Sequence, residues 1–230
     1  MMLAKIAIAA VALALLAPVS VPAQAGEVRL PGGMPSVTVK SMRELRFNAV
    51  VGQQHDFSCG AAALATLLKY HYGTDVTEAQ LVEAMMAAGD GERIRREGFS
   101  MADMQRFLAT HGVRSNGYWA SLADLRNAGI PVIALIDVKG YRHFVVVKGV
   151  SDSHVLIGDP VFGLKSYRIA DFEKIKVGPL FAIDDHPDMG RSSFNQPEQW
   201  AFQPRRAVMD ARWRDSIALS SILLRSPSEF

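Results

Sequence analysis

The feature that most constrains the fold is a change in hydrophobic period near Gly129. Before this glycine, apolar residues recur at helical spacing in several segments, and most of these segments follow a Ser or Thr that suits a helix cap. After it, short apolar runs are separated by turn residues, as is typical of β-strands. The sequence therefore predicts an α+β protein that is helical first and sheet-rich second.

The helix and strand segments follow from this pattern and from their flanking residues. The first helix is expected at 59–72, with Ser58 as a candidate N-cap. Three further helices follow capping sequences and are expected at 81–88, 104–110 and 125–128. Strands are expected at 130–136, 143–150, 154–157, 164–169 and 180–183.

The first 25 residues have the pattern of an export signal. Lys5 precedes an apolar run at 6–17, and Ala23-Gln24-Ala25 suits a cleavage site, so we expect a cut after Ala25 and a periplasmic location. The run is shorter than the ~20 residues that a bilayer-spanning helix needs. We therefore expect no transmembrane segment in the mature chain.

Three segments are expected after the signal. Residues 26–44 lack a hydrophobic period and predict an extended lead-in, residues 45–185 carry the folded domain, and residues 186–230 form an extension without an assigned role. Within the lead-in, Gly32-Gly33 is either a flexible turn or, if the domain cuts after paired glycines, a self-processing site.

The charge balance argues against nucleic acid as a partner. Lys and Arg number 25 against 23 Asp and Glu, which gives a formal net charge of +2. Two short basic patches, at 93–96 and 204–206, are interpreted as solvated loops or local charged faces, although the first could also contact an acidic partner.

Cys59 is the single cysteine of a chain that is expected to be exported, so it cannot form an internal disulfide. It lies where the first helix should begin, and unpaired amides in a first helical turn favour a thiolate anion. The small residues at 60–63 leave room for a substrate backbone. The same features would also suit an inert thiol at a tightly packed helix start.

Among six histidines, His143 has the best placed acidic partner. If residues 151–153 form the turn between two strands, position 145 pairs with Asp159, and His143 lies diagonal to Asp159 at about 7–8 Å. A register slip of one residue would separate them. His71 lies on the apolar stripe of the first helix and is expected in the core. A strand-edge histidine and a turn-starting aspartate remain the alternative.

A glutamine six residues before the cysteine could help to stabilise an oxyanion. Gln53 could reach the helix start beside the backbone amide of Cys59, although Gln54 competes for this role and either could be a solvated loop residue. A zinc site is not expected, because one cysteine and scattered histidines lack the usual spacing of zinc ligands.

Three segments together resemble the peptidase C39 family over about residues 45–185: Gln-Gln-His-Asp-Phe-Ser-Cys-Gly-Ala-Ala-Ala-Leu at 53–64, Tyr-Arg-His-Phe-Val-Val-Val at 141–147 and Gly-Asp-Pro at 158–160. The resemblance implies a papain-like fold in which the cysteine helix packs on an antiparallel sheet. It also implies specific roles: Cys59 as nucleophile, His143 as base, Asp159 as its orienting acid and Gln53 in the oxyanion hole. Ser58 is a departure, since many transporter-fused members have Asp there.

The resemblance also implies hydrolysis of a protein or peptide substrate without a cofactor. Transporter-fused members cut leader peptides after Gly-Gly, whereas this free-standing exported chain more closely resembles proteases of functional-amyloid secretion systems. Amyloid or other secretion-system components are thus the expected partners.

Two other functions fit parts of the pattern. A cell-wall hydrolase of the NlpC/P60 type also uses an exported Cys and His, but it usually has a second His where this chain has Asp159. A catalytically silent C39-like domain could bind a secretion substrate, but such domains lack the cysteine that this chain keeps at position 59.

Overall fold

The computed structural model describes residues 26–28 and 37–201, in two units that divide after Ser41. In the first unit, β1 (Gly26–Val28) pairs with β2 (Val37–Val39) as an antiparallel hairpin within the predicted lead-in. The predicted signal at 1–25 and the Gly32-Gly33 pair lie outside the described residues.

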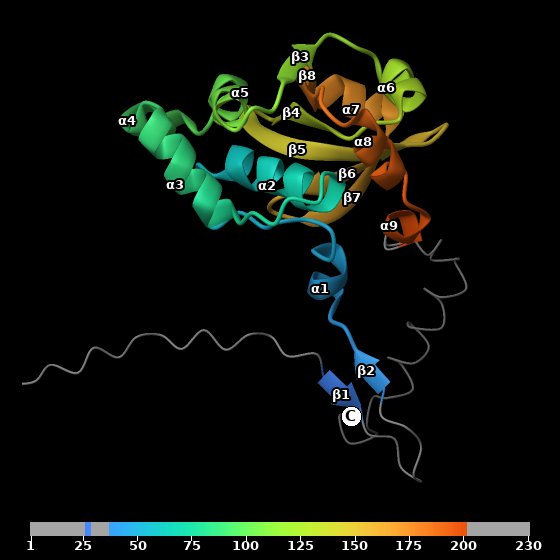
Figure 1. Cartoon of the computed structure of the whole chain (residues 1–230). Coiled ribbons are helices and arrows are strands. Elements are labelled where there is room, and N and C mark those ends of the chain that lie inside the picture. The colour runs from blue at the N-terminus through green and yellow to red at the C-terminus, as the bar shows by residue number, and fades with distance from the viewer. Residues whose placement is uncertain (1–25, 29–36, 202–230) are drawn as a thin grey trace, which may run out of the picture. The chain divides into compact units, whose positions relative to one another are not determined.

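The second unit is built on a six-stranded antiparallel sheet with the strand order β3-β8-β4-β5-β6-β7 (Figure 1). Three hairpins connect β4 to β7 in chain order, and β8 then returns to pair with β4. The strands are β3 (Ser115–Tyr118), β4 (Val132–Val138), β5 (Tyr141–Val150), β6 (His154–Asp159), β7 (Gly163–Arg168) and β8 (Lys176–Ile183).

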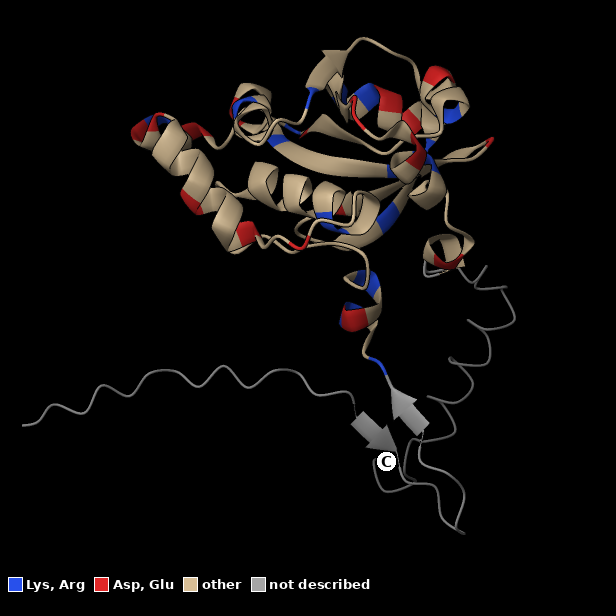
Figure 2. Ribbon diagram, in the orientation of Figure 1, with Lys and Arg blue, Asp and Glu red and all other residues tan. Residues whose placement is uncertain are grey.

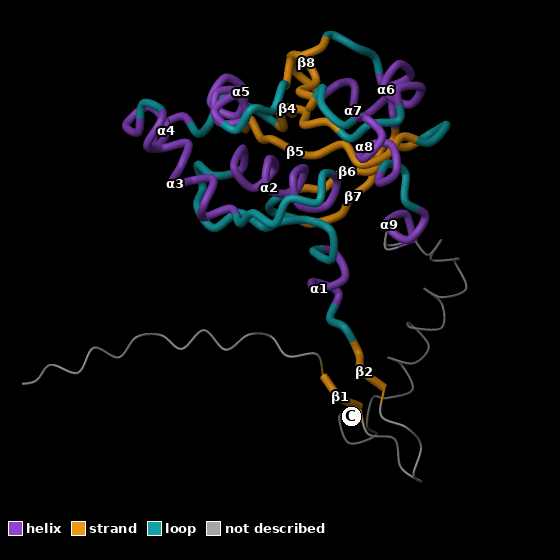
Figure 3. The backbone as a smooth tube through the Cα atoms, viewed as in Figure 1, coloured by secondary structure: helices purple, strands orange, loops and turns teal. Residues whose placement is uncertain are grey.

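Helices cover both faces of this sheet (Figure 3). In the described part of the unit they are α1 (Met42–Arg46), α2 (Cys59–His71), α3 (Glu78–Ala88), α4 (Gly91–Glu97), α5 (Met101–Thr110), α6 (Leu122–Ala128), α7 (Ile169–Ile175), α8 (Pro187–Ser193) and α9 (Pro197–Ala201). One core cluster joins α2, α3 and α5 to the sheet, and a second joins α6 and α7 to it. The predicted α+β class is confirmed.

The sequence of β5 shows why both faces need a cover. Phe144 and Val146 belong to the core cluster under α2, whereas Val145 and Val147 belong to the cluster under α6 and α7. Alternate side chains of a strand point to opposite faces, so a continuous valine run is stable only between two layers. Small residues such as Ala61, which is fully buried, let α2 approach the sheet closely.

The three predicted capping sequences form as expected. Thr77, Ser100 and Ser121 each accept a hydrogen bond from the third residue of their helix and complete a capping box. Ser58 differs, because its hydroxyl bonds to the backbone of His55 and makes no cap hydrogen bond to α2. Ser58 is therefore the N-cap residue of α2, as predicted, but its side chain gives the first amides of the helix no capping bond.

The basic patch at 93–96 is helical rather than a loop, because it lies in α4. Ile94 anchors this helix in the core, and Arg93 forms an ion pair with Asp103 at 2.6 Å. Charged residues are spread over the described ribbon rather than gathered on one face (Figure 2). The second basic patch, at 204–206, lies outside the described residues.

The C-terminal segment also contributes to the folded unit. Residues 186–230 were predicted to be an extension of unknown role. In its described part, up to residue 201, α8 packs against α2, and Phe194 is buried in the core under α6 and α7. Across the described ranges, none of the helices combines the length and the apolar character needed to cross a membrane.

Candidate active site

The thiol of Cys59 lies in the first turn of α2, where the helix meets the start of β5. Gly60 makes this contact possible, since a Cβ at this position would lie 3.0 Å from Cβ of Phe99 and 3.4 Å from the ring of Phe144. Cys59 is a free cysteine with 8% of its surface exposed. A thiol in this first turn is near unpaired amides that favour its anion.

His143 and Asp159 come together from adjacent strands. Val146 pairs with Gly158, so the two residues are diagonal neighbours on one face of the sheet. His143 Nε2 and Asp159 Oδ1 are 2.9 Å apart, and both side chains are buried. The structure thus brings together the two residues that strand spacing had paired.

This register depends on a bulge in β5 that was not predicted. The turn after β5 is longer than predicted, because Val150 pairs with Val155. A register shift between Val147 and Gly149 absorbs the extra residue. Without the bulge, His143 would align one residue further along the partner strand, and its ring would point to the other face from Asp159.

The surroundings of His143 favour its charged form. Burial alone would lower its pKa, but the hydrogen bond to Asp159 and the nearby Cys59 outweigh burial and raise the pKa to about 9. Nε2 is bonded to Asp159, and the buried Nδ1 has no hydrogen-bond partner within the described part of the chain. Nδ1 is therefore the nitrogen left for the thiol.

The carboxylate of Asp159 is fixed by its own turn. Burial would raise its pKa, but the bond to His143 and the backbone amides of Val161 and Phe162 lower it below the usual range. These amides donate to Oδ1 at 2.8 and 3.2 Å. The residue stays ionised and holds the imidazole in one tautomer and orientation.

Gln53 is tied to the same turn. Its backbone amide donates to the carbonyl of Pro160 at 3.0 Å, and its side-chain Nε2 donates to the carbonyl of His55 at 3.0 Å. Its Oε1 is buried and has no partner among the described residues. Gln54 is exposed and bonds through its backbone to Glu78. Gln53 is thus the more enclosed of the two glutamines.

A pocket of about 780 Å³ opens over His143 and Asp159. The loop 52–56, the hairpin between β4 and β5, and the turn between β6 and β7 supply most of its lining. Tyr141, which is 54% exposed, stacks on the imidazole with ring centroids 5.8 Å apart. A pocket of this size suits a few residues of an extended peptide.

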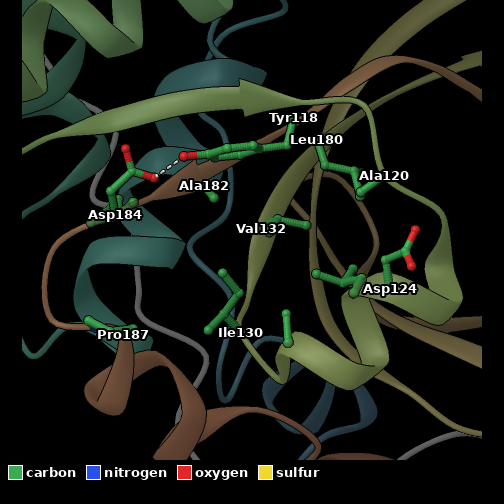
Figure 4. A pocket seen from close by; sticks show the side chains of 12 residues that line it. Tyr118, Ala120, Asp124, Ile130, Val132, Leu180, Ala182, Asp184 and Pro187 are labelled. Carbon is green, nitrogen blue, oxygen red and sulfur yellow. Dashed lines mark hydrogen bonds between the residues drawn. The ribbon is translucent and has the colours of Figure 1, made fainter.

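A second pocket, of about 460 Å³, lies elsewhere, between α6 and the β3–β8–β4 part of the sheet (Figure 4). Its lining is mostly apolar, with Ile130, Val132 and Leu180 among the contributors. Its main polar feature is Tyr118, whose hydroxyl donates to Asp184 Oδ1 at 2.7 Å. It holds none of the predicted site residues.

The remaining histidines are not placed for the same chemistry. His71 is buried in the core as expected, between Lys148 and Ser193. His111 ends α5, and His154 bonds to Ser153. Within residues 26–28 and 37–201, no group of three or more His, Cys, Asp or Glu is arranged to hold a metal ion.

A thiol at a helix start, beside an imidazole and a carboxylate on neighbouring strands of an α+β domain, defines the class of papain-like cysteine peptidases. The comparison with protein families narrows this class. The model of the peptidase C39 family matches residues 48–183, and the chain belongs to that family. It is a cysteine peptidase.

Curated proteins from two organisms cover most of this chain. It is 40% identical over 191 residues to the probable functional amyloid protease FapD of Pseudomonas aeruginosa. This match covers 81% of this chain and 84% of the relative. The probable functional amyloid protease FapD of Pseudomonas fluorescens is 42% identical over 166 residues, or 70% and 74% of the two chains.

A solved structure shows the same fold. The peptidase domain of Streptococcus ComA, a bifunctional ABC transporter involved in quorum sensing, matches with a TM-score of 0.51 and 22% identity. The match covers 59% of this chain and 96% of that domain. At this identity the likeness describes the architecture alone.

Proposed function

We propose that the chain is a periplasmic cysteine endopeptidase of functional-amyloid biogenesis in which Cys59, His143 and Asp159 form the catalytic triad. The observation that carries the triad is the 2.9 Å bond between His143 and Asp159 beside the thiol. The amyloid link is supported by the FapD relatives, because the match to this chain covers most of the length of each of them.

In the proposed mechanism, the Cys59 thiolate attacks the carbonyl carbon of the scissile peptide bond and forms a thioester. His143 carries the proton of the thiol on Nδ1 and transfers it to the leaving amine. A water molecule then attacks the thioester, with His143 as general base, and releases the acid product. Asp159 keeps the imidazole oriented throughout.

The oxyanion needs donors beside the thiol. The backbone amide of Cys59 is one candidate, because Ser58 makes no side-chain cap to α2. The side chain of Gln53 is the other, and its Nε2 would exchange the carbonyl of His55 for the oxyanion when the substrate binds.

The proposed location rests on the export pattern at 1–25, which predicts a mature chain that begins at Gly26. Intact mass of the protein purified from periplasm would test the cut after Ala25. If the native protein has the mass of a chain that begins after Gly33, and the Cys59→Ala variant has the mass of a chain that begins at Gly26, the protein processes itself. If the native protein has the mass of a chain that begins at Gly26, Gly32-Gly33 is a flexible turn.

The proposed function can be tested by comparing protein N-termini in periplasm and medium between cells with the native chain and cells with Cys59→Ala. We expect new termini that vanish in the variant, and they should lie in an amyloid subunit or another secretion-system component. Matching sets of termini, with both proteins present at equal levels, would contradict proteolysis. Termini that vanish only in unrelated proteins would contradict the amyloid assignment.

A further inference from the structure

The pocket at the candidate active site contains a cation that the proposed mechanism does not use. Lys165 pairs with Ile157 in the hairpin of β6 and β7, whereas Asp159 pairs with Gly163. Lys165 is therefore a diagonal neighbour of Asp159 on one face, at about 7–8 Å. Its side chain lines the same pocket as His143.

Two aromatic rings hold the Lys165 ammonium in place. Nζ lies 4.6 Å from the ring centroid of Phe162 and 5.1 Å from that of Tyr167, and it donates a hydrogen bond to the Tyr167 hydroxyl at 3.0 Å. An ammonium has three donors, so this bond leaves two for a ligand. Within the described ranges, no carboxylate forms an ion pair with Lys165.

The acid nearest to Lys165 on its own hairpin, Asp159, is already engaged by His143 and by two backbone amides. The other acid of the lining, Asp56, belongs to the loop before α2. A second cation, Arg43 of α1, also lines the pocket, with its guanidinium 5.6 Å from the ring centroid of Phe47. The pocket is therefore suited to an anionic group near β7.

We propose that Lys165 is a specificity-determining residue that binds an Asp or Glu side chain of the substrate. The proposal rests on the peptidase function proposed above, because it needs a peptide lying across Cys59 and His143. An extended peptide advances about 3.3 Å per residue, so a carboxylate that reaches Lys165 belongs to a residue within about three positions of the cleaved bond.

The hydrogen-bond donors explain why a carboxylate is the expected ligand. Two remaining N–H donors can engage the oxygens of one carboxylate in charge-assisted bonds, which a neutral amide cannot match. Because two rings lie close to the ammonium and Lys165 is half-buried, the ammonium is partly shielded from water. Its attraction for an anion is therefore less screened than at an open surface. Salt should still weaken the preference.

The test is cleavage of a peptide library in which Asp, Asn, Glu and Gln are compared at each of the three positions on both sides of the cut. We expect roughly tenfold higher kcat/KM for the acid than for its amide at one position. Lys165→Met should abolish this ratio, Lys165→Arg should keep it, and Lys165→Glu should favour Lys or Arg at that position instead.

Lys174→Met is the matched control, because Lys174 is an exposed lysine of α7 that does not line the pocket. This variant should keep the acid preference of the wild type. Cleavage without an acid preference, or a preference that survives in Lys165→Met, would overturn the role of Lys165 and leave the peptidase function standing. No cleavage of any library peptide would overturn both.

Discussion

The imidazole of His143 lies between a carboxylate and a thiol, and each nitrogen has a separate task. Nε2 binds Asp159, while the thiol is left to Nδ1. Because both neighbours favour the imidazolium, the pKa rises to about 9 despite burial. His143 therefore keeps its proton through neutral pH, which is what protonation of a leaving amine requires.

We expect kcat/KM to fall as the pH rises through about 9, because His143 then loses the proton for the leaving group. Asp159→Asn removes the carboxylate that raises this pKa, so the alkaline limb should move down by about one unit. A pH profile on a cleaved peptide measures both. If the alkaline limb of the pH profile lies at the same pH in Asp159→Asn as in the wild type, the pairing of His143 with Asp159 is contradicted.

The same shift predicts the sign of a stability effect. The folded-state pKa of His143 lies above its ordinary value of 6.5, so the stabilisation from its partners is fully present below pH 6.5. It is lost as the pH rises through about 9. This trend must be separated from that of other buried groups.

Gln53→Ala should lower kcat by about 10²–10³-fold with little change in KM, because an oxyanion donor acts mainly in the transition state. Gln54→Ala is the control, since Gln54 is exposed, and it should remain close to the wild type. Steady-state kinetics on one peptide separate the two variants. Equal losses, or a change in KM alone, would argue against the oxyanion role.

At the residue level, the spacing of residues along strands predicted more of the candidate site than the sequence of its loops did. The predicted pairing of His143 with Asp159 holds because the longer turn after β5 and the β5 bulge, neither of them predicted, offset each other. The choice between Gln53 and Gln54 needed the tertiary contact with Pro160. The pairing of Lys165 was missed, although a tight hairpin after Asp159 would have placed it on the same face.

At the scale of elements, short turns determine how the strands position the side chains of the candidate site. Gly163 begins β7 directly opposite Asp159, with a φ of +76° that side chains rarely adopt. A Cβ there would lie 2.6 Å from the carbonyl oxygen of Arg46. The turn that orients the carboxylate of Asp159 therefore has room only for glycine.

Gly163→Ala should lower the free energy of unfolding by clearly more than Gly140→Ala, as measured by urea denaturation. Gly140 has a φ of +88° but nothing within 4 Å of its Cβ position, so its variant carries only the left-handed backbone cost of about 1–2 kcal/mol. Gly163→Ala adds a clash with backbone. Equal losses would show that the close approach to Arg46 is easily relieved.

Helix prediction succeeded where sequence carries its own local signal. Thr77, Ser100 and Ser121 formed capping boxes, because a cap depends on residues three positions apart. The short helix α4 was missed although Asp90 caps it through the amides of Glu92 and Arg93. The short helix α7 has no side-chain cap and is held by the fully buried Phe172, and it was missed, as was the edge strand β3. The β5 bulge was also missed, although Gly149 lies beside it and a glycine inside a strand often marks a bulge.

At the scale of the whole molecule, a buried polar chain links three distant segments. Lys148 of β5 lies with Nζ 2.7 Å from His71 Nε2 on α2, and His71 Nδ1 lies 2.7 Å from Ser193 Oγ on α8. Burial lowers the pKa of Lys148 to about 7, and burial followed by the nearby Lys148 lowers that of His71. Helix α8 is thereby tied to α2, the helix that begins at Cys59.

Lys148→Met should change how stability depends on pH. The folded-state pKa of about 7 lies below the ordinary 10.5, so wild-type stability falls as the pH drops from about 10.5 to 7, where only the unfolded chain takes up the proton. Methionine takes up no proton, so the variant does not lose stability in this way. Urea unfolding at pH 7 and 9.5 should show that the stability of the variant relative to the wild type is higher at pH 7 than at pH 9.5.

The opposite trend of His143 is common to both proteins and cancels in this comparison. Parallel stability curves for wild type and Lys148→Met would contradict a neutral Lys148 in the folded state.

The packing of α8 was not predicted from sequence, because its polar composition at 187–193 gives no apolar stripe, and its order comes from contacts such as Ser193 with His71.

The central claim is that Cys59 is a nucleophile activated by His143, and the rate of its alkylation tests this most directly. Cys59 is the single cysteine, so intact mass after iodoacetamide reports this thiol alone. We predict rapid alkylation at pH 6 that falls at least about tenfold in His143→Ala, because the imidazolium stabilises the thiolate. An inert thiol at pH 6 in the folded wild type, or equal rates in both proteins, would contradict the account.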